Sequence, residues 1–274
     1  MAIGFQHIES LLNEYSSLNL SQIIDYDKFN RFSIVHHSTT IEGSTLTEVE
    51  TRLLLDEGHT PKGKPLLHSL MVQDHFNALL FIIDAADKKK LADVELIQQI
   101  NAHVMKTTGS VYNTPLGEID SSQGAFRKGN VSAGGSYFVN YDKVPGLVNR
   151  LCKKIMDKLS GIQNTQEQLE LSFDAHFDLV TTHPFYDGNG RTGRLLMNFI
   201  QHWFGLPLSI VFKEDKADYF QSLSDTRSKE DISIFRVFMY EQTAKYLQEE
   251  IRKYKEIKDG SDGYKKGGGY SMIF

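Results

Sequence analysis

Apolar residues recur at the three-to-four-residue spacing of an α-helix along most of this 274-residue chain. The clearest case is residues 69–86, where leucine, phenylalanine and isoleucine side chains fall on one broad stripe. The same spacing predicts further helices over residues 93–106, 144–160, 166–182, 192–204, 216–225 and 231–255. We therefore predict an all-α fold class.

Glycine, serine and asparagine interrupt this pattern in residues 109–143. Within that stretch, residues 130–139 resemble two short strands around a Gly-Gly turn, which predicts a β-hairpin on an otherwise helical protein. A second interruption follows residue 256, where the chain has too many glycines to pack as a helix. We expect this tail, within residues 246–274, to fray.

The composition narrows the possible functions. Thirty basic against 35 acidic residues and 40% hydrophobic residues give enough apolar material for a core. They provide no broad basic surface, so direct nucleic-acid binding is not expected. A single cysteine, Cys152, excludes an intramolecular disulfide, and its helical neighbours predict a buried thiol. No secretory signal is recognisable and no apolar run approaches the roughly 18 residues of a membrane span, so we expect a cytoplasmic protein.

The most informative segment is His-Pro-Phe-Tyr-Asp-Gly-Asn-Gly-Arg-Thr-Gly-Arg at residues 183–194. Pro184 ends the preceding helix at His183, and helical spacing resumes so that a second helix starts near Arg191. Glycines between the helices permit left-handed backbone, so that successive N–H groups can converge into a concave nest. The N-terminus of the second helix adds unpaired N–H groups and a positive dipole end, which favour an anion.

The charged side chains of this segment suit phosphate chemistry. Arg191 and Arg194 lie three residues apart and can face the same side, which is unfavourable at a helix N-terminus unless a polyphosphate neutralises them. Asp187 offers a hard oxygen ligand for magnesium, and His183 titrates near neutrality, as a general base should. The segment therefore indicates nucleotide phosphoryl or nucleotidyl chemistry. The alternative is a glycine-rich turn with a capping histidine and solvated arginines.

HPFYDGNGRTGR resembles, at every defined position, the signature HPFx(D/E)GNGRxxR of the Fic (Fido) family. The resemblance extends more loosely over residues 92–245. It implies a mainly helical Fic fold with a β-hairpin flap, and transfer of AMP from ATP to a protein hydroxyl. It divides the chain into an N-terminal helical region (1–91), a catalytic core (92–245) with a flap (125–139) and an active loop (183–194), and a C-terminal helix end with its tail (246–274).

The resemblance also implies roles for the loop residues. His183 would deprotonate a Ser, Thr or Tyr hydroxyl of a target protein, which attacks the α-phosphate and releases pyrophosphate. Asp187 would hold Mg²⁺ against the α- and β-phosphates. The remaining nucleotide contacts would come from Gly188, Asn189 and Gly190 as the anion hole, Arg191 on the inner phosphates, Thr192 and Gly193, and Arg194 on the γ-phosphate.

Two further segments are similar to family elements. Residues 125–139 resemble the flap, which aligns a target segment by strand addition. Its tip would lie near the nucleotide and consists of Ala133, Gly134, Gly135 and Ser136. Tyr219 resembles the family tyrosine that lies on the adenine, with aromatic packing on a helix as the alternative. Arg227 stands where the family often has an asparagine, which leaves the nucleotide preference open.

A second motif lies upstream, because Ser38-Thr-Thr-Ile-Glu42-Gly43 resembles the inhibitory-helix motif (S/T)xxxE(G/N) of the same family. The pattern alone is weak, and a short helix that ends at Glu42 with Gly43 after it would also explain it. A carboxylate at a helix C-terminus opposes the dipole, however, and so indicates a partner elsewhere. The resemblance implies that Glu42 pairs with Arg194 and takes the place of the γ-phosphate, which would make the protein self-inhibited.

Several alternatives remain open at this point. The same site can work in reverse and remove AMP from a modified protein, with Glu42 orienting a water. It can transfer another nucleotide or phospho-group, or it can be a non-enzymatic nucleotide-binding module. The expected partners are ATP and a target protein, which can be the chain itself through Tyr264, Tyr270 or Ser271. A homodimer is also expected.

Overall fold

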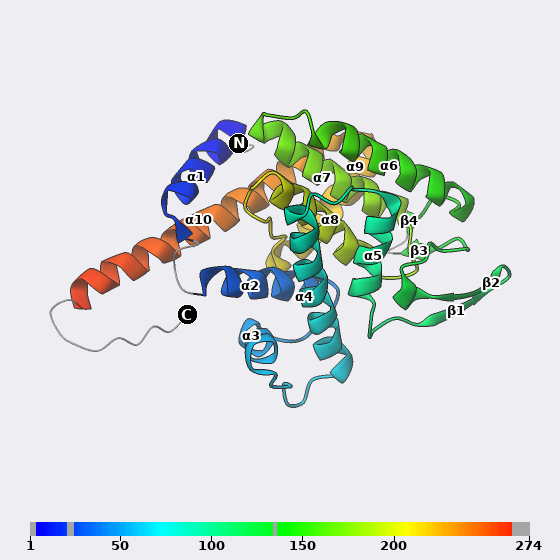
Figure 1. The fold of residues 1–274 in the computed structure, drawn as a ribbon, viewed down its shortest axis with the longest axis horizontal. Helices are drawn as coiled ribbons and strands as arrows, with labels where there is room; N and C mark the ends of the chain where they lie inside the picture. Colours follow the sequence, from blue (N-terminus) through cyan, green and yellow to red (C-terminus); the bar gives the residue numbers. More distant parts are fainter. Residues whose placement is uncertain (1–3, 21–24, 134–135, 265–274) are drawn as a thin grey trace.

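The computed structural model describes residues 4–20, 25–133 and 136–264 and confirms a mainly helical fold (Figure 1). Its helices in this described part are α1 (Phe5–Ser17), α2 (Tyr26–Ile41), α3 (Glu48–Glu57), α4 (Leu66–Asp87), α5 (Val94–Val104), α6 (Val144–Leu159), α7 (Thr165–Thr182), α8 (Asn189–Trp203), α9 (Lys216–Lys229) and α10 (Ile232–Tyr264). Its strands are β1 (Val111–Thr114), β2 (Gly117–Asp120), β3 (Ser132–Ala133) and β4 (Ser136–Tyr137).

Helix α8 forms the centre of the molecule. All residues from Arg191 to Gln201 are buried, and the helix packs against α7, α4 and α5 (Figure 1). A helix that is buried on every side belongs to the core, so the sequence around it has to satisfy the polar groups that it carries inward. Because the active-loop motif continues directly into α8, both of its arginines lie on this buried helix.

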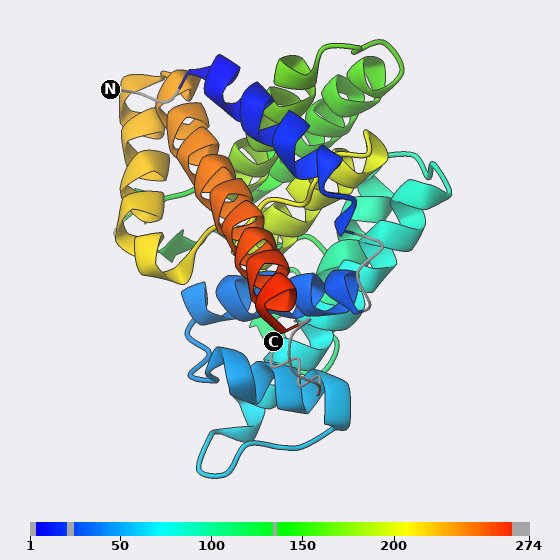
Figure 2. The same ribbon diagram turned by 90° about the vertical axis from the view of Figure 1, so that its left-hand side faces the viewer.

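The N-terminal helices share this core. Helix α1 lies along α10 (Figure 2), and α2 packs against α4 and reaches α8. Helix α3 packs against α2 and α4 at the foot of the molecule (Figure 1). One hydrophobic cluster runs from Ile8 through Leu79 and Ile200 to Ile251. Helices α1, α3 and α4 therefore belong to the same core as α2 and α8.

Two antiparallel hairpins lie next to the active loop. The predicted one pairs Ser132 with Tyr137 and Ala133 with Ser136, whereas Gly134 and Gly135 lie outside the described residues. The pairing of β1 with β2 over residues 111–120 was not expected. Its sequence signal is a turn at Gly117, which has a φ of +101° that glycine tolerates.

The C-terminal expectation was wrong in part, because the main chain of α10 stays helical as far as Tyr264, past the predicted end at residue 255. Each helix-interior glycine costs only about 1 kcal/mol relative to alanine. Once a long helix is nucleated, every further residue adds a hydrogen bond, so Gly260 and Gly263 do not stop it. Residues 265–274 lie outside the described part of the chain.

Helix α4 is long and apolar enough to cross a membrane by length and composition alone. In this fold 44% of its most apolar window is buried, and it packs against α2, α5 and α8. The core helix of a globular protein passes the same test, so this result is weak support for a span. The absence of a membrane span stays a prediction.

Candidate active site

The loop between α7 and α8 contains two left-handed residues. His183 has a φ of 51° and ends α7, as Pro184 after it predicts, and Gly188 has a φ of 77° immediately before α8. A Cβ on Gly188 would lie 2.9 Å from Asn101 Nδ2 and from Met105 Sδ. This position therefore requires glycine both for its backbone angle and for the close approach of α5.

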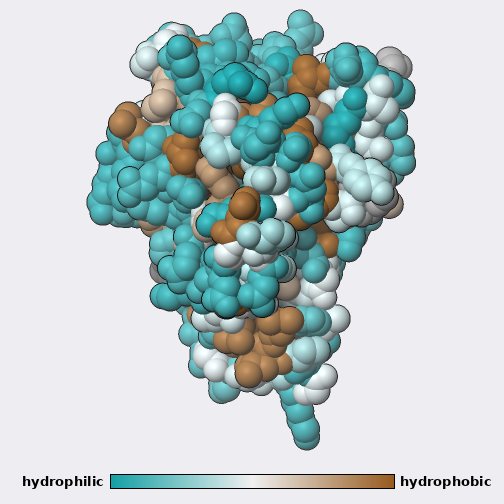
Figure 3. All heavy atoms as spheres, turned by 90° about the vertical axis from the view of Figure 1, so that its right-hand side faces the viewer, coloured by the Kyte–Doolittle hydropathy of each residue, from teal (hydrophilic) through white to brown (hydrophobic). Residues whose placement is uncertain are grey.

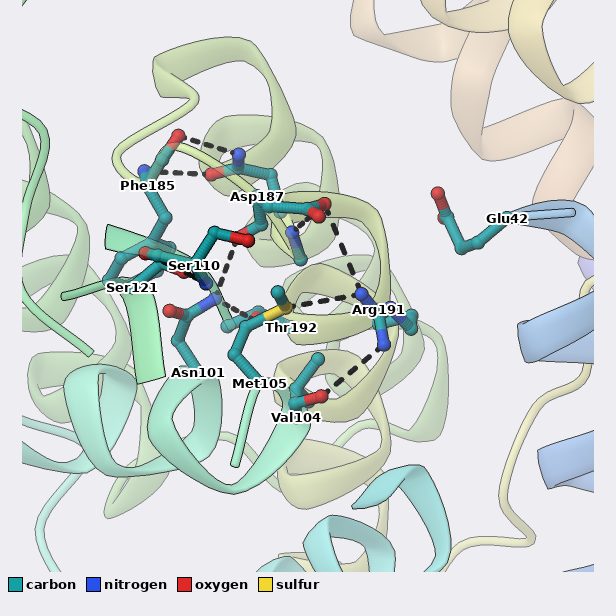
Figure 4. Close-up of polar contacts among 12 residues, drawn as sticks. Glu42, Asn101, Val104, Met105, Ser110, Ser121, Phe185, Asp187, Arg191 and Thr192 are labelled. Atoms are coloured by element: carbon teal, nitrogen blue, oxygen red, sulfur yellow. Dashed lines mark hydrogen bonds and ion pairs between the residues drawn. The ribbon is translucent and has the colours of Figure 1, made fainter. Parts of the chain in front are cut away.

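Side-chain amides hold the loop in one shape (Figure 4). Asn189 accepts a hydrogen bond from the Phe185 N–H and donates one to the Phe185 carbonyl, both at 2.9 Å. Asn101 Nδ2 donates to the Asp187 carbonyl and to Thr192 Oγ1, both at 3.1 Å. Asn189 thus holds the loop to itself and Thr192 connects it to α5, whereas the Gly188 N–H donates to Asp187 Oδ1.

Of the two glycines predicted between the helices, Gly188 has the left-handed backbone that a nest uses and Gly190 does not. Gly190 and Gly193 belong to α8 and have ordinary helical backbone, so any need for glycine at these positions comes from the space available for a side chain. A Cβ on Gly190 would lie 2.4 Å from Glu42 Oε1, and a Cβ on Gly193 would lie 2.9 Å from His176 Cδ2. Gly193 is therefore closely packed against α7, whereas at Gly190 the nearest atom is the end of the flexible Glu42 side chain, which can move aside.

Arg191 is a buried cation with weak partners. Its Nη1 donates to the Val104 carbonyl at 3.3 Å and its Nη2 contacts Met105 Sδ at 3.2 Å (Figure 4). Asp187 Oδ1 lies 3.9 Å from Nη2, and the buried Nε has no hydrogen-bond partner among the described residues. A guanidinium has five donors suited to phosphate oxygens, so Arg191 retains capacity for an anion.

Arg194 is bound to the predicted inhibitory motif. Its Nε donates to Ser38 Oγ at 2.8 Å, and its Nη2 donates to the Ser38 carbonyl at 3.0 Å and to Glu42 Oε1 at 2.7 Å. Glu42 caps the C-terminus of α2, and Gly43 follows with a φ of +104°, as the helix-end pattern predicts. The structure therefore brings together two motifs that are 152 positions apart in the sequence.

The Glu42–Arg194 pair joins a buried guanidinium to a partly exposed carboxylate. The Glu42 side chain is 30% exposed to solvent. Removal from water raises the pKa of Glu42, but the charge and hydrogen bond of Arg194 outweigh this effect. The pKa of Glu42 is therefore below its ordinary value, and the pair is charged at neutral pH.

His183 lies under the flap, and its imidazole stacks on the Phe138 ring with the centroids 3.9 Å apart and the planes 18° apart. Burial, followed by the positive charge of Arg127, lowers the pKa of His183 to about 4. The expectation that His183 titrates near neutrality was therefore wrong, because desolvation disfavours the imidazolium. The imidazole is neutral at pH 7 and can accept a proton.

Asp187 points its carboxylate toward the open side of the loop, with 57% of its side-chain surface exposed. No cluster of three or more acidic, histidine or cysteine side chains that could hold a metal occurs among the described residues. A magnesium ion at Asp187 would therefore take its other ligands from phosphates and water, as Mg²⁺ usually does in proteins. One exposed carboxylate close to Arg191 fits such an ion.

Tyr219 lies in the core and not at the loop surface. Its side chain is 1% exposed, its hydroxyl is 2.8 Å from His176 Nε2, and its ring lies 6.0 Å from the Arg194 guanidinium. This arrangement favours the aromatic-packing alternative, because a base cannot stack on a covered ring. The guanidinium of Arg227 faces the flap, 6.0 Å from the centre of the Phe138 ring.

Sequence reasoning missed several residues that build this site. Asn101 interrupts the apolar stripe of α5, and such a polar residue on a core-facing helix was the available signal. Arg127 and Phe138 lie in the glycine-rich segment, where no periodicity separates buried from exposed positions. Of the predicted flap tip, only the main chain of Ala133 and Ser136 is described.

Comparison with known proteins agrees with the motif. Residues 91–201 match the family model described as the Fic/DOC family. The chain is 31% identical over 218 residues to "Protein adenylyltransferase Fic" of Drosophila grimshawi, a match that covers 79% of this chain and 42% of the relative. The chain thus spans about two fifths of the length of the curated relatives it matches.

Solved structures share the fold. A Fic-domain-containing signaling protein from Bacteroides thetaiotaomicron has a TM-score of 0.77 at 24% identity, with 91% of this chain and 98% of that chain covered. A fragment of Fic-1 from C. elegans has a TM-score of 0.69 at 24% identity, with 94% and 73% covered. The complete loop signature lies within the matched residues, so the family match shows that residues 91–201 carry a Fic domain.

Proposed function

We propose that the chain is a self-inhibited protein adenylyltransferase, which transfers AMP from ATP to a Ser, Thr or Tyr hydroxyl of a target protein. The observation that carries this proposal is the pair of buried arginines at the start of α8 beside a neutral imidazole. Arg191 Nε and Arg194 Nη1 are buried without a hydrogen-bond partner in the described chain, so both cations have donors to spare. The names of the relatives support adenylyl transfer as the reaction.

In the proposed reaction the neutral His183 accepts the proton of the target hydroxyl. The hydroxyl oxygen forms a bond to the α-phosphorus, and the bond from that phosphorus to the pyrophosphate oxygen breaks. The N–H groups at the start of α8 and Arg191 stabilise the charge on the phosphates. Asp187 would hold Mg²⁺, which supplies further neutralisation of the phosphate charge when it is bound.

Self-inhibition follows from the contact between Glu42 and Arg194. Glu42 occupies Arg194 Nη2, and Ser38 occupies Nε as well. A γ-phosphate that needs this guanidinium fork has to displace a carboxylate of the same charge. ATP then binds with its phosphates misplaced, and the in-line geometry is lost.

Mass spectrometry tests the proposal directly. Lysate proteins are incubated with Mg²⁺, each nucleoside triphosphate in turn and the Glu42→Gly protein, with the Glu42→Gly/His183→Ala protein as the matched control. We expect a gain of one AMP mass on a target peptide with ATP, absent from the control. A gain of a different mass would assign another transferred group, and no gain with any nucleotide would contradict transferase activity.

Removal of AMP is the competing reaction at the same site. It is favoured by the partial exposure of Glu42, whose carboxylate can still orient a water. An adenylylated target that loses AMP with wild-type protein, but not with Glu42→Gly protein, would establish this direction.

We also propose that the protein forms a homodimer and that it is cytoplasmic. Exposed apolar side chains gather at the foot of the molecule, in α3 and at the start of α4 (Figure 3), and comprise Val49, Leu53, Leu66 and Leu67. Contiguous exposed apolar patches mark interaction sites. We expect Leu66→Asp/Leu67→Asp to convert a dimer into a monomer in sedimentation analysis, with an unchanged circular dichroism spectrum. A wild-type protein that sediments as a monomer would refute the dimer.

A further inference from the structure

Arg127 is the most deeply placed cation next to the flap, and only 2% of its surface is exposed. Its Nε donates to the His183 carbonyl at 2.8 Å, its Nη1 to the Gly129 carbonyl at 2.8 Å, and its Nη2 to the Val139 carbonyl at 2.5 Å. Its main-chain N–H donates to the Pro184 carbonyl at 2.9 Å. Every one of these acceptors belongs to the active loop or to the ends of the flap.

Burial of the Arg127 charge has a cost in folding free energy. No ion pair in the described part of the chain includes Arg127, so carbonyl oxygens alone compensate for its burial. A buried charge without an opposite charge is destabilising, and apolar side chains of similar volume often serve a core at least as well. Packing alone therefore does not account for an arginine here, whereas a planar fork that joins three separate carbonyls does.

The carbonyls that Arg127 joins belong to two elements. His183 has a left-handed backbone, which is strained for a residue other than glycine, and Arg127 binds its carbonyl in that conformation. Gly129 and Val139 stand on either side of the β3–β4 hairpin. Because one rigid guanidinium binds all three groups, the base of the flap and the main chain of His183 cannot shift independently.

Phe138 provides the second link, on the side chain of His183. Its ring covers one face of the imidazole, and the Arg227 guanidinium lies 6.0 Å from the centre of the same ring. The charged groups that act on His183 are Arg127, Glu42 and Arg227. Two flap residues thus contact His183, Arg127 at its carbonyl and Phe138 at its ring, while the backbone of Val180 on α7 forms a hydrogen bond with the imidazole.

We propose that Arg127 and Phe138 are positioning residues that make His183 part of the flap, so that the hairpin that receives the target also holds the general base in place. This inference rests on the proposed function. It assigns the flap a second task besides strand addition, because displacement of the hairpin moves the group that accepts the proton.

The first experiment separates rate from binding in the Glu42→Gly protein. We expect Arg127→Lys, which keeps the charge but loses the fork, to lower kcat at least tenfold, with the KM for ATP within twofold. Arg236→Lys is the matched control, since it weakens a fork on Asp174 elsewhere in the fold and should leave kcat within twofold. A kcat for Arg127→Lys within twofold of its parent, at an unchanged melting temperature, would overturn the role of Arg127.

The second experiment measures the pKa of His183 by NMR titration. Burial is the largest cause of its low pKa, so Phe138→Ala should raise the pKa from about 4 toward the ordinary 6.5. The acid limb of the rate profile should move to higher pH with it, and Phe138→Tyr, which keeps the stack, should restore both. A pKa that stays near 4 in Phe138→Ala would overturn the flap contact.

The two readouts distinguish this inference from the proposed function. If the Glu42→Gly protein transfers no nucleotide, the proposed function fails while the NMR titration still decides whether the flap controls His183. If Arg127→Lys does not fold, the Phe138 variants decide the inference, because Phe138 is only partly buried. Unfolding would also raise the pKa of His183, so the shift counts for the inference only where Phe138→Ala keeps the circular dichroism spectrum of its parent.

Discussion

Glu42→Gly is expected to raise the rate of AMP transfer by about 5- to 150-fold, the range that a coupling free energy of about 1–3 kcal/mol corresponds to. The substitution removes the carboxylate that lies 2.7 Å from Arg194 Nη2 and frees this donor for a γ-phosphate. Glu42→Gln keeps the size and removes the charge, so it should give an intermediate rate. Labelled ATP measures the transfer, and equal rates for wild type and Glu42→Gly would rule out inhibition by Glu42.

The same substitution should change stability in a way that ATP reverses. Removing one partner of a buried ion pair costs about 3–5 kcal/mol, and the 30% exposure of Glu42 places this pair at or below the lower end of that range. Without ATP the variant should melt at a lower temperature than wild type. A ligand at about 100 times its Kd restores about 2.7 kcal/mol, so ATP should raise the melting temperature more for the variant than for wild type.

Mild acid should not relieve this inhibition. The folded pKa of Glu42 is lowered, so the stabilisation from its charge is fully present above the ordinary carboxyl pKa. It is lost only as the pH falls through the lowered folded value. Across the neutral range the contact with Arg194 therefore remains complete, and release requires a competing ligand or a movement of α2.

His183→Ala is expected to abolish transfer in the Glu42→Gly protein, with a loss of about 10²- to 10⁴-fold, the contribution of a general base. ATP affinity, measured by calorimetry, should stay within twofold, because the proposed phosphate donors are Arg191, Arg194 and main-chain N–H groups.

A backbone-matched variant separates the base from its conformation. His183 has a left-handed backbone, which asparagine tolerates better than alanine does. His183→Asn should therefore keep the loop shape while it lacks the base, and it should be as inactive as His183→Ala. Transfer by His183→Asn above about one tenth of its parent would show that the imidazole is not the base.

The helices could be predicted because their cause is local. Apolar residues at helical spacing mark a face that must be buried, and α4 to α9 lie where that spacing placed them, within a few residues at their ends. The β1–β2 hairpin escaped prediction because its strands are only four residues long, too short for an alternation of apolar and polar residues to show. Helix α10 extends beyond the end of its apolar spacing, because adding residues to an existing helix does not require an apolar face.

By itself the sequence determined the turn of the active loop through Pro184 and Gly188, and the charged residues within the loop predict an affinity for phosphate. Only the tertiary structure decided what surrounds these groups. Burial lowers the proton affinity of His183, the Glu42 carboxylate of the distant α2 lies next to Gly190, and the core covers Tyr219. Backbone angles and charges are properties of the residues themselves, whereas burial and proximity arise only where distant segments meet.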